Sequence, residues 1–439
     1  MDRRQFVAAM AAAVGTADAS TELAVNGGAP VRTTPLHAGN WGPEYYDDKE
    51  KAELAGVVDS RHPFRFGGGR GQDAPVKVLT FEKEFAQRMG ARYALGVTSG
   101  TAALEVAYNA LAIGPGDEVI LPAWTWHSDA MAVVRSGALP VFAEIDESFN
   151  IDPNDIEHRI TPHTKVIVAV HLQGNPADLD KILPVAKKHG LKLLEDSAQA
   201  VGASYKGRPT GSIGDIAIYS HQETKTITSG EGGTVVTSDP VLFERALRFH
   251  DVGGLRRPQQ AMLPKVQLNP FVAANFRMSE FTGGVMLAQL RKLDAILEAT
   301  RRNAARVYEG VRDLPGIRFR SRPDPAGETG VAVFIRFETK SRCDKFVEAM
   351  RAEGVPVSKP GGSVVLPIQT YIEKKITVHP AWPTWTSERG KAIQYGAANC
   401  PRTIDILERF AGPAMHPKHT DQDVKDIIAA IRKVYPQVT

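Results

Sequence analysis

The sequence of 439 residues predicts an α/β protein in which a mainly parallel sheet is sandwiched by helices and followed by a smaller α+β domain. Short apolar runs alternate with helix-like stretches from residue 94 onward, and this alternation builds parallel strands joined by right-handed crossovers. A chain of this length that is 43% hydrophobic also exceeds one average domain and can bury a large core. We therefore expect a large domain over residues 20–295 and a small domain over residues 296–439.

Each element is predicted from an apolar run of strand or helix period that is bounded by turn residues. Strands are expected at residues 94–97, 119–121, 139–142, 166–170, 192–195 and 216–219. Helices are expected at residues 47–59, 81–89, 99–112, 128–136, 155–159, 179–189 and 240–250. A further helix should run from near Glu280 to residue 297, and a linking helix should span residues 295–314. The small domain should contain strands at 317–319 and 331–337 and helices at 341–353 and 421–434.

The carboxyl ends of the parallel strands are expected to meet at one edge of the sheet, which is where such folds collect ligands. Gly100, Trp126, Asp196 and Ser220 all fall at or just beyond a predicted strand end. The segment from Ser99 to Thr101 opens a helix, and the free N–H groups and positive dipole end there form an anion site. The sequence thus predicts an anionic ligand at this edge.

The stretch from residue 193 to 237 carries the chemistry. One predicted strand ends on Glu195 and Asp196, the next ends on Ser220, and Lys225 follows in a polar turn. Because side chains alternate along a strand, one of the two carboxylates should point into the site. A carboxylate, a lysine and small hydroxyl donors suit pyridoxal phosphate, which needs a partner for its ring nitrogen, an amine for its aldehyde and donors for its phosphate. The simpler alternatives are a surface lysine and a solvated strand end.

This stretch resembles the DegT/DnrJ/StrS family of sugar aminotransferases, which are fold-type-I pyridoxal phosphate enzymes. The resemblance rests on Glu195-Asp196-Ser197-Ala198-Gln199, on the spacing from Ser220 to Lys225, and on the turn from Gly230 to Gly233. It extends over about residues 27 to 433 and is greatest for the branch that aminates keto-cyclitols such as scyllo-inosose. It implies a seven-stranded sheet of the fold-type-I kind.

The resemblance also implies how the cofactor is held. Lys225 is the Schiff-base lysine and the catalytic proton carrier, and Asp196 binds the ring nitrogen. Trp126 stacks on the ring, although a core position is its simpler interpretation. Gln199 lies near the phenolic oxygen, or else it has a structural role at a helix start. The remaining cofactor-binding residues supply the phosphate cup and are Gly100, Thr101 and Ser220.

A second motif, Asn275-Phe276-Arg277-Met278, implies an obligate homodimer with shared active sites. In the family the asparagine reaches the phosphate of the neighbouring subunit, and this role falls to Asn275. Arg277 either binds the carboxylate of the amino donor or pairs across the dimer. His127, beside the stacking tryptophan, is a further substrate-binding candidate.

The function that follows is a ping-pong transfer of an amino group from glutamate or glutamine to a keto sugar or keto-cyclitol. One alternative is a regulatory pyridoxal phosphate-binding protein of the same fold. Another is a sugar dehydratase of this family, but such enzymes have histidine in place of the lysine. A nucleotide-dependent oxidoreductase is disfavoured because no GxGxxG follows a predicted strand, and the glycines of residues 67–71 lack that context.

Composition excludes several other functions. The net charge of +3 and the dispersed basic residues give no reason to expect nucleic acid binding. Two cysteines and scattered histidines provide neither a disulfide framework nor a metal-ligand spacing, so no metal is expected. No apolar run is long enough to span a membrane.

Residues 1–19 have the order of a twin-arginine signal peptide. Arg3 and Arg4 precede a short apolar run, residues 8–14, and Ala17-Asp18-Ala19 fits a cleavage site. We therefore expect export to the periplasm. An ordinary alanine-rich helix on a cytoplasmic protein is the alternative.

A reporter fused after Ser20 tests this expectation. It should be exported while Arg3 and Arg4 are intact and retained when both are replaced by lysine, because the export machinery recognises the arginine pair. Fractionation of the periplasm measures the outcome. Retention of the unmodified fusion in the cytoplasm would contradict the expectation.

Overall fold

The computed structural model describes residues 22–66 and 76–438. The predicted signal segment, residues 1–19, and the glycine-rich loop at residues 67–71 lie outside the described residues. The described part contains no helix that is long and apolar enough to cross a lipid bilayer. Cys343 and Cys400 are both buried and free.

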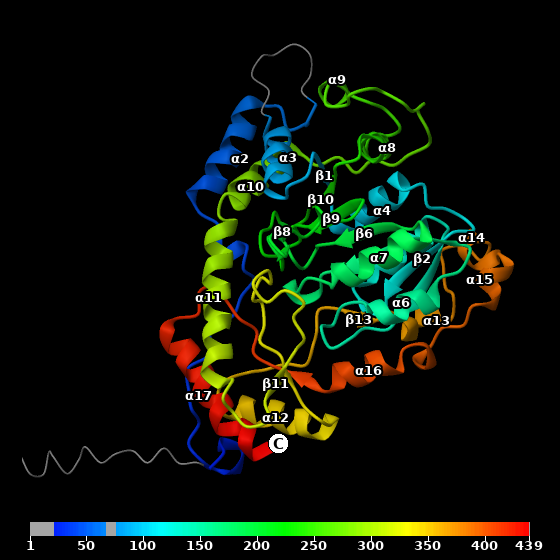
Figure 1. Ribbon diagram of the computed structural model, residues 1–439. Coiled ribbons are helices and arrows are strands. Elements are labelled where there is room, and N and C mark those ends of the chain that lie inside the picture. The colour runs from blue at the N-terminus through cyan, green and yellow to red at the C-terminus, as the bar shows by residue number, and fades with distance from the viewer. Residues whose placement is uncertain (1–21, 67–75, 439) are drawn as a thin grey trace, which may run out of the picture.

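The large domain is built on a seven-stranded sheet, seen at the centre of Figure 1, with the order β1-β10-β9-β6-β5-β2-β4. Its strands are β1 (Tyr93–Val97), β2 (Glu118–Pro122), β4 (Leu139–Ala143), β5 (Thr164–Val170), β6 (Lys192–Asp196), β9 (Ile216–Ser220) and β10 (Gly233–Thr237). Only β10 runs against its neighbours, so the mainly parallel sheet is confirmed. β10 was not predicted from the sequence.

Alternate side chains of each strand enter different apolar cores, one on each face of the sheet. In β6, Leu194 packs in the core that contains α4 (Gly100–Ala110), α5 (His127–Arg135) and α8 (Pro240–His250). Its neighbour Leu193 packs on the other face, in the core with α6 (Pro153–Arg159) and α7 (Leu179–His189). Farther along that face, α3 (Lys77–Arg88) and α10 (Glu280–Leu290) cover the end of the sheet formed by β1, β10 and β9. Beside α3 and α10 lies α2 (Asp48–Ser60).

The helix expected to run from near Glu280 to residue 297 is in fact two helices. The first, α10, ends at Leu290, and α11 (Leu293–Val311) begins after a turn at Arg291 and Lys292. The buried Lys292 amine binds the Glu50 carboxylate and the Tyr45 carbonyl oxygen. The prediction was wrong here because these distant contacts fix the turn, whereas the local sequence favours a continuous helix.

The small domain packs α11, α12 (Lys340–Ala352) and α17 (Asp421–Val438) against a three-stranded sheet. That sheet contains β11 (Arg318–Phe319), β12 (Ile335–Arg336) and β14 (Phe410–Ala411). Figure 1 shows α11 running from the large domain to this part of the molecule. The N-terminal segment also belongs here, because Leu23 lies in its core and Arg32 pairs with Asp423 and Asp426.

Between α12 and α17, the chain returns to the large domain. There β13 (Val364–Val365) pairs with β3 (Trp124–Thr125), which follows the end of β2. This pairing brings the loop at residues 361–363 to the carboxyl edge of the parallel strands. The other elements of the described chain are η1 (Ala24–Asn26), η2 (Pro43–Tyr45), η3 (Leu172–Gly174), β7 (Ser204–Tyr205), β8 (Arg208–Pro209), α9 (Arg257–Gln260), η4 (Leu366–Ile368), α13 (Thr370–Glu373), α14 (Pro383–Thr386), α15 (Glu388–Ala392), η5 (Ala397–Asn399) and α16 (Pro401–Glu408).

Candidate active site

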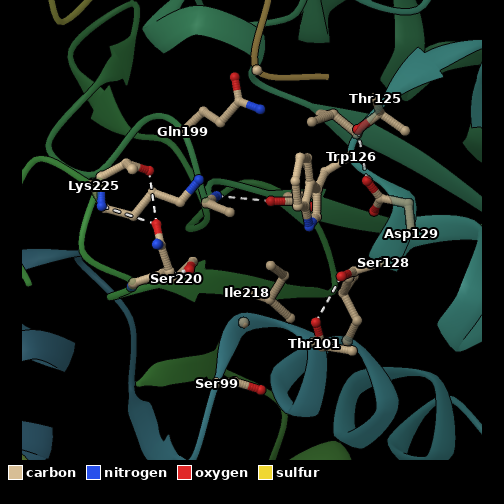
Figure 2. A pocket seen from close by; sticks show the side chains of 18 of the residues that line it. Ser99, Thr101, Thr125, Trp126, Ser128, Asp129, Gln199, Ile218, Ser220 and Lys225 are labelled. Atoms are coloured by element: carbon tan, nitrogen blue, oxygen red, sulfur yellow. Dashed lines mark hydrogen bonds between the residues drawn. The ribbon is translucent and has the colours of Figure 1, made fainter. Parts of the chain in front are cut away.

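A cavity of about 480 Å³ lies at the carboxyl edge of the parallel strands, within the range of ordinary ligand sites. Figure 2 shows side chains from several separate elements pointing into it. Seven of the residues singled out from the sequence line this one cavity: Gly100, Thr101, Trp126, Asp196, Gln199, Ser220 and Lys225. Three others, Asn275, His127 and Arg277, do not line it.

One end of the cavity is the N-terminus of α4. The Ser99 hydroxyl accepts the Ala102 N–H and caps the helix, so the first N–H groups of α4 remain available for an anion. A Cβ at Gly100 would lie 2.8 Å from the Ser220 Cβ, so glycine is required for this close approach. The Thr101 hydroxyl hydrogen-bonds Ser128 over 2.6 Å. The result is a cup of hydroxyl and N–H groups at a positive helix end.

Lys225 lies in the turn after β9, and Figure 2 shows its side chain extending into the cavity. Within the described ranges, its amine has neither a hydrogen-bond nor an ion-pair partner. Burial lowers the pKa of the Lys225 amine, and the charge of Asp196 opposes that shift only in part. A larger fraction of this amine is therefore unprotonated and nucleophilic than for an exposed lysine.

Asp196 ends β6 and points into the cavity, whereas the adjacent Glu195 points away from it. Glu195 accepts N–H groups from Gly211, Ile213 and Gly214, and it pairs with His171 over 3.0 Å. Burial alone would raise the pKa of Glu195, but these donors outweigh burial and the pKa is lowered. Glu195 is thus a structural anion that fixes the strand end, and alternation leaves Asp196 to face the ligand.

The environment of Asp196 is less polar. Its Oδ1 accepts the Ala198 N–H over 2.7 Å. Burial raises the pKa of the Asp196 carboxyl, although the Ala198 N–H and the Lys225 charge oppose the rise. The Asp196 carboxylate accepts few hydrogen bonds, so its negative charge would stabilise a cationic group that is placed against it.

Gln199 joins two loops at the side of the cavity. Its Oε1 accepts the Gln173 N–H over 3.0 Å, and its Nε2 donates to the Ser363 hydroxyl over 3.2 Å. Gln173 also donates from its side chain to the carbonyl oxygen of Gly361. Both amide atoms of Gln199 thus hold the cavity wall, from a turn and not from a helix start.

Trp126 is 51% exposed, an unusual position for so large an apolar ring. Because it lines the cavity, this exposed face provides a stacking surface for a planar ligand. His127 packs edge-on against Trp126, and its Nδ1 lies 2.5 Å from the hydroxyl of Tyr371. His127 therefore faces the segment after β13, outside the cavity.

Asn275 and Arg277 lie together beyond the N-terminal end of α10. Asn275 is exposed, and its backbone forms a bridge with Asp251. Arg277 forms an ion pair with Asp251 and lies over the ring of Phe64. Neither side chain reaches the cavity of its own chain, so a role in ligand binding requires the cavity of a second subunit.

Several lining residues were not singled out in the sequence, among them Ser128, Asp129 and Gly362. Asp129 stands in the first turn of α5, but its neighbours in space come from other strands. Gly362 reaches the cavity through the pairing of β13 with β3, which no local pattern reveals.

These features fit pyridoxal phosphate. The hydroxyl and N–H cup at α4 suits the phosphate, and the Lys225 amine that extends into the cavity suits the aldehyde. The buried Asp196 carboxyl suits the ring nitrogen, and the exposed Trp126 face suits the ring. All four features line one cavity of adequate volume.

A family model described as the DegT/DnrJ/EryC1/StrS aminotransferase family matches residues 73–432. The chain is 37% identical over 351 residues to an L-glutamine:2-deoxy-scyllo-inosose aminotransferase of Streptomyces kanamyceticus, covering 77% of this chain and 80% of the relative. It is 32% identical over 376 residues to the spore coat polysaccharide biosynthesis protein SpsC of Bacillus subtilis, covering 82% of this chain and 89% of that protein.

The fold is also that of solved aminotransferases. An aminotransferase from Psychrobacter cryohalolentis superimposes with a TM-score of 0.75 at 28% identity, covering 92% of this chain and 100% of that one. The alternative of an unrelated nucleotide-dependent oxidoreductase is thereby set aside. The chain belongs to the DegT/DnrJ/EryC1/StrS aminotransferase family, whose members are pyridoxal phosphate-dependent.

Proposed function

We propose that this chain transfers an amino group from glutamine or glutamate to the ketone of a keto-cyclitol or keto sugar, with pyridoxal phosphate as its cofactor. The observation that carries the proposal is that the Lys225 amine, unpaired within the described residues, and the Asp196 carboxyl line the same cavity as the anion cup of α4. When bound, pyridoxal phosphate supplies an aldehyde that accepts the amino group and a ring that withdraws electrons from the reacting carbon.

The chain's own residues have separate tasks in this proposal. The N–H groups of Gly100 and Thr101 and the Ser220 hydroxyl bind the phosphate. Asp196 holds a proton on the ring nitrogen through its negative charge. Lys225 would hold the cofactor through its aldehyde. As a free amine it would take the proton from the donor carbon and give it to the cofactor, and it would move a proton in the reverse direction when the acceptor is aminated. Its lowered pKa increases the fraction of unprotonated amine that can act as a base.

The acceptor class is supported by a second cavity of about 250 Å³, which adjoins the first at Lys225, Gln199 and Gly362. Its other polar side chains are uncharged hydrogen-bonding groups, from Gln173, Thr224 and Thr226, and Trp41 contributes an aromatic face. Amides, hydroxyls and an aromatic ring suit a neutral polyhydroxylated ring. The name of the Streptomyces kanamyceticus relative, an L-glutamine:2-deoxy-scyllo-inosose aminotransferase, supports glutamine as donor and a cyclitol as acceptor.

We propose further that the enzyme is a homodimer with shared active sites and that it is exported through its twin-arginine segment. The exposed position of Asn275, outside its own cavity, supports the shared site. Export would favour a free cyclitol or sugar as acceptor, because nucleotide-linked sugars are made and used inside cells.

The two half-reactions test the function. Protein loaded with pyridoxal phosphate should lose its visible absorbance on addition of L-glutamine or L-glutamate, and a keto-cyclitol such as scyllo-inosose should restore it. Lys225→Ala should slow both steps by about a thousandfold or more, because it removes the proton carrier. Lys187→Ala, on the exposed side of α7, is the matched control. A spectrum that no amino donor alters would contradict the proposal and favour a regulatory protein.

Subunit mixing tests the shared site. Lys225→Ala and Asn275→Ala should each be inactive or weak alone, yet an equal mixture of the two should recover about a quarter of the wild-type activity. The reason is that half of the dimers are hybrids, and each hybrid has one site with both native residues if Asn275 acts across the interface. Tandem affinity tags isolate the hybrids for assay. Hybrids without activity would show that Asn275 does not act across an interface.

A further inference from the structure

A second buried carboxyl, that of Asp129, lines the cavity beside Asp196. Asp129 lies in the first turn of α5 and is only 1% exposed. Figure 2 shows it directed into the cavity from the side of Thr125 and Trp126. The proposed function assigns it no task, although an acidic group is costly to bury and needs a partner.

The contacts of Asp129 leave one oxygen open. Its Oδ2 accepts the Thr125 hydroxyl over 2.6 Å. Its Oδ1 is buried and receives no hydrogen bond from a donor in the described chain. The Asp196 carboxyl lines the same cavity, and its charge raises the pKa of Asp129. Two ionised carboxylates in one buried site repel each other, so a single proton held by the pair is favoured.

The surrounding groups decide which carboxyl holds that proton. The charge of Lys225 favours an ionised Asp196, which also accepts the Ala198 N–H. Tyr108 of α4 faces the pair as a neutral phenol, because burial raises its pKa well above the usual value. Among the residues that the structure describes, the Thr125 hydroxyl is the one donor to the Asp129 carboxyl. Burial and the neighbouring charge of Asp196 raise the pKa of Asp129 well above that of an ordinary carboxyl.

We propose that Asp129 is a positioning residue which, as a neutral acid, donates a hydrogen bond to the Asp196 carboxylate and so orients it toward the cofactor. This proposal rests on the proposed binding of pyridoxal phosphate. The Thr125 hydroxyl donates to Oδ2 of Asp129, so Oδ1 would carry the proton and donate it in a hydrogen bond to Asp196. Two buried carboxyls that share one proton are an established way of giving neighbouring acids different ionisation states.

Two variants, Asp129→Asn and Asp129→Ala, distinguish a neutral Asp129 that donates a hydrogen bond from an ionised Asp129. In Asp129→Asn, the amide oxygen can accept the Thr125 hydroxyl while the amide NH₂ donates to Asp196, so asparagine reproduces the neutral acid. Asp129→Ala removes both hydrogen bonds. An ionised Asp129 that supplied a second negative charge would be mimicked by neither variant.

The first measurement is the affinity for pyridoxamine phosphate, an amine that cannot bond covalently to Lys225. Asp129→Asn should bind it as wild type does, and Asp129→Ala should bind it about tenfold more weakly because a hydrogen bond to a charged group is lost. Equal weakening in both variants would overturn the proposal in favour of an ionised Asp129. Affinity that neither substitution changes would overturn it in favour of a purely structural role.

The second measurement is the pH dependence of the melting temperature without cofactor. Because the Asp129 pKa is raised by folding, the folded protein binds a proton that the unfolded chain releases. The contribution of Asp129 to the free energy of unfolding is therefore fully present below the ordinary pKa of a carboxyl group. It is lost as the pH rises through the raised pKa of Asp129 in the folded protein. Asp129→Asn should lack this decline.

The decline in wild type and its absence in Asp129→Asn would support the proposal even if Asp129→Ala does not fold. Identical pH profiles for wild type and Asp129→Asn would overturn it. Failure of wild type to bind pyridoxamine phosphate would instead contradict the proposed function, and the melting profiles would still report whether the two carboxyls share a proton.

Discussion

The rest of the site depends on the hydrogen bonds that the Glu195 carboxylate accepts on one face of the sheet. This carboxylate gathers three backbone N–H groups from residues 211–214 together with His171, and it is fully buried. The His171 Nδ1 accepts the Ala177 N–H, so its Nε2 carries the proton that is donated to Glu195. A carboxylate with this many donors is a firm anchor for the end of β6.

The functional geometry follows from that anchor. Because successive side chains of a strand point to opposite faces, fixing Glu195 on one face of β6 directs Asp196 into the cavity. The same residues 211–214 lead directly into β9, which places Ser220 at the cup and Lys225 in the next turn. The buried Glu195 carboxylate therefore helps to position both Asp196 and Lys225, the two residues assigned to the ring nitrogen and the aldehyde of the cofactor. Tight packing maintains this arrangement, since a Cβ at Gly214 would meet the Leu193 carbonyl oxygen at 2.7 Å.

The sequence was sufficient for the parts of the structure that local patterns encode. Six of the seven sheet strands, and the gathering of residues from four strand ends at one edge, follow from apolar periodicity and parallel topology. The distinction between Glu195 and Asp196 needed the family motif, because alternation alone says only that they face opposite ways. β10 was not predicted because a short apolar run that follows a glycine turn resembles an extended loop. Contacts between distant segments determine the turn at Lys292, the place of the N-terminal segment in the small-domain core and the presence of Asp129 and Asp196 in one cavity. Local propensity carries no information about such contacts.

The proposed chemistry depends on a covalent bond between the Lys225 amine and the aldehyde of pyridoxal phosphate. Borohydride reduction of the loaded enzyme converts such a bond into a stable link, and peptide mapping by mass spectrometry then locates it. We expect one added cofactor per chain, on Lys225, and none on Lys225→Ala. A reduced label on any other lysine, or no label on protein that binds the cofactor, would contradict it.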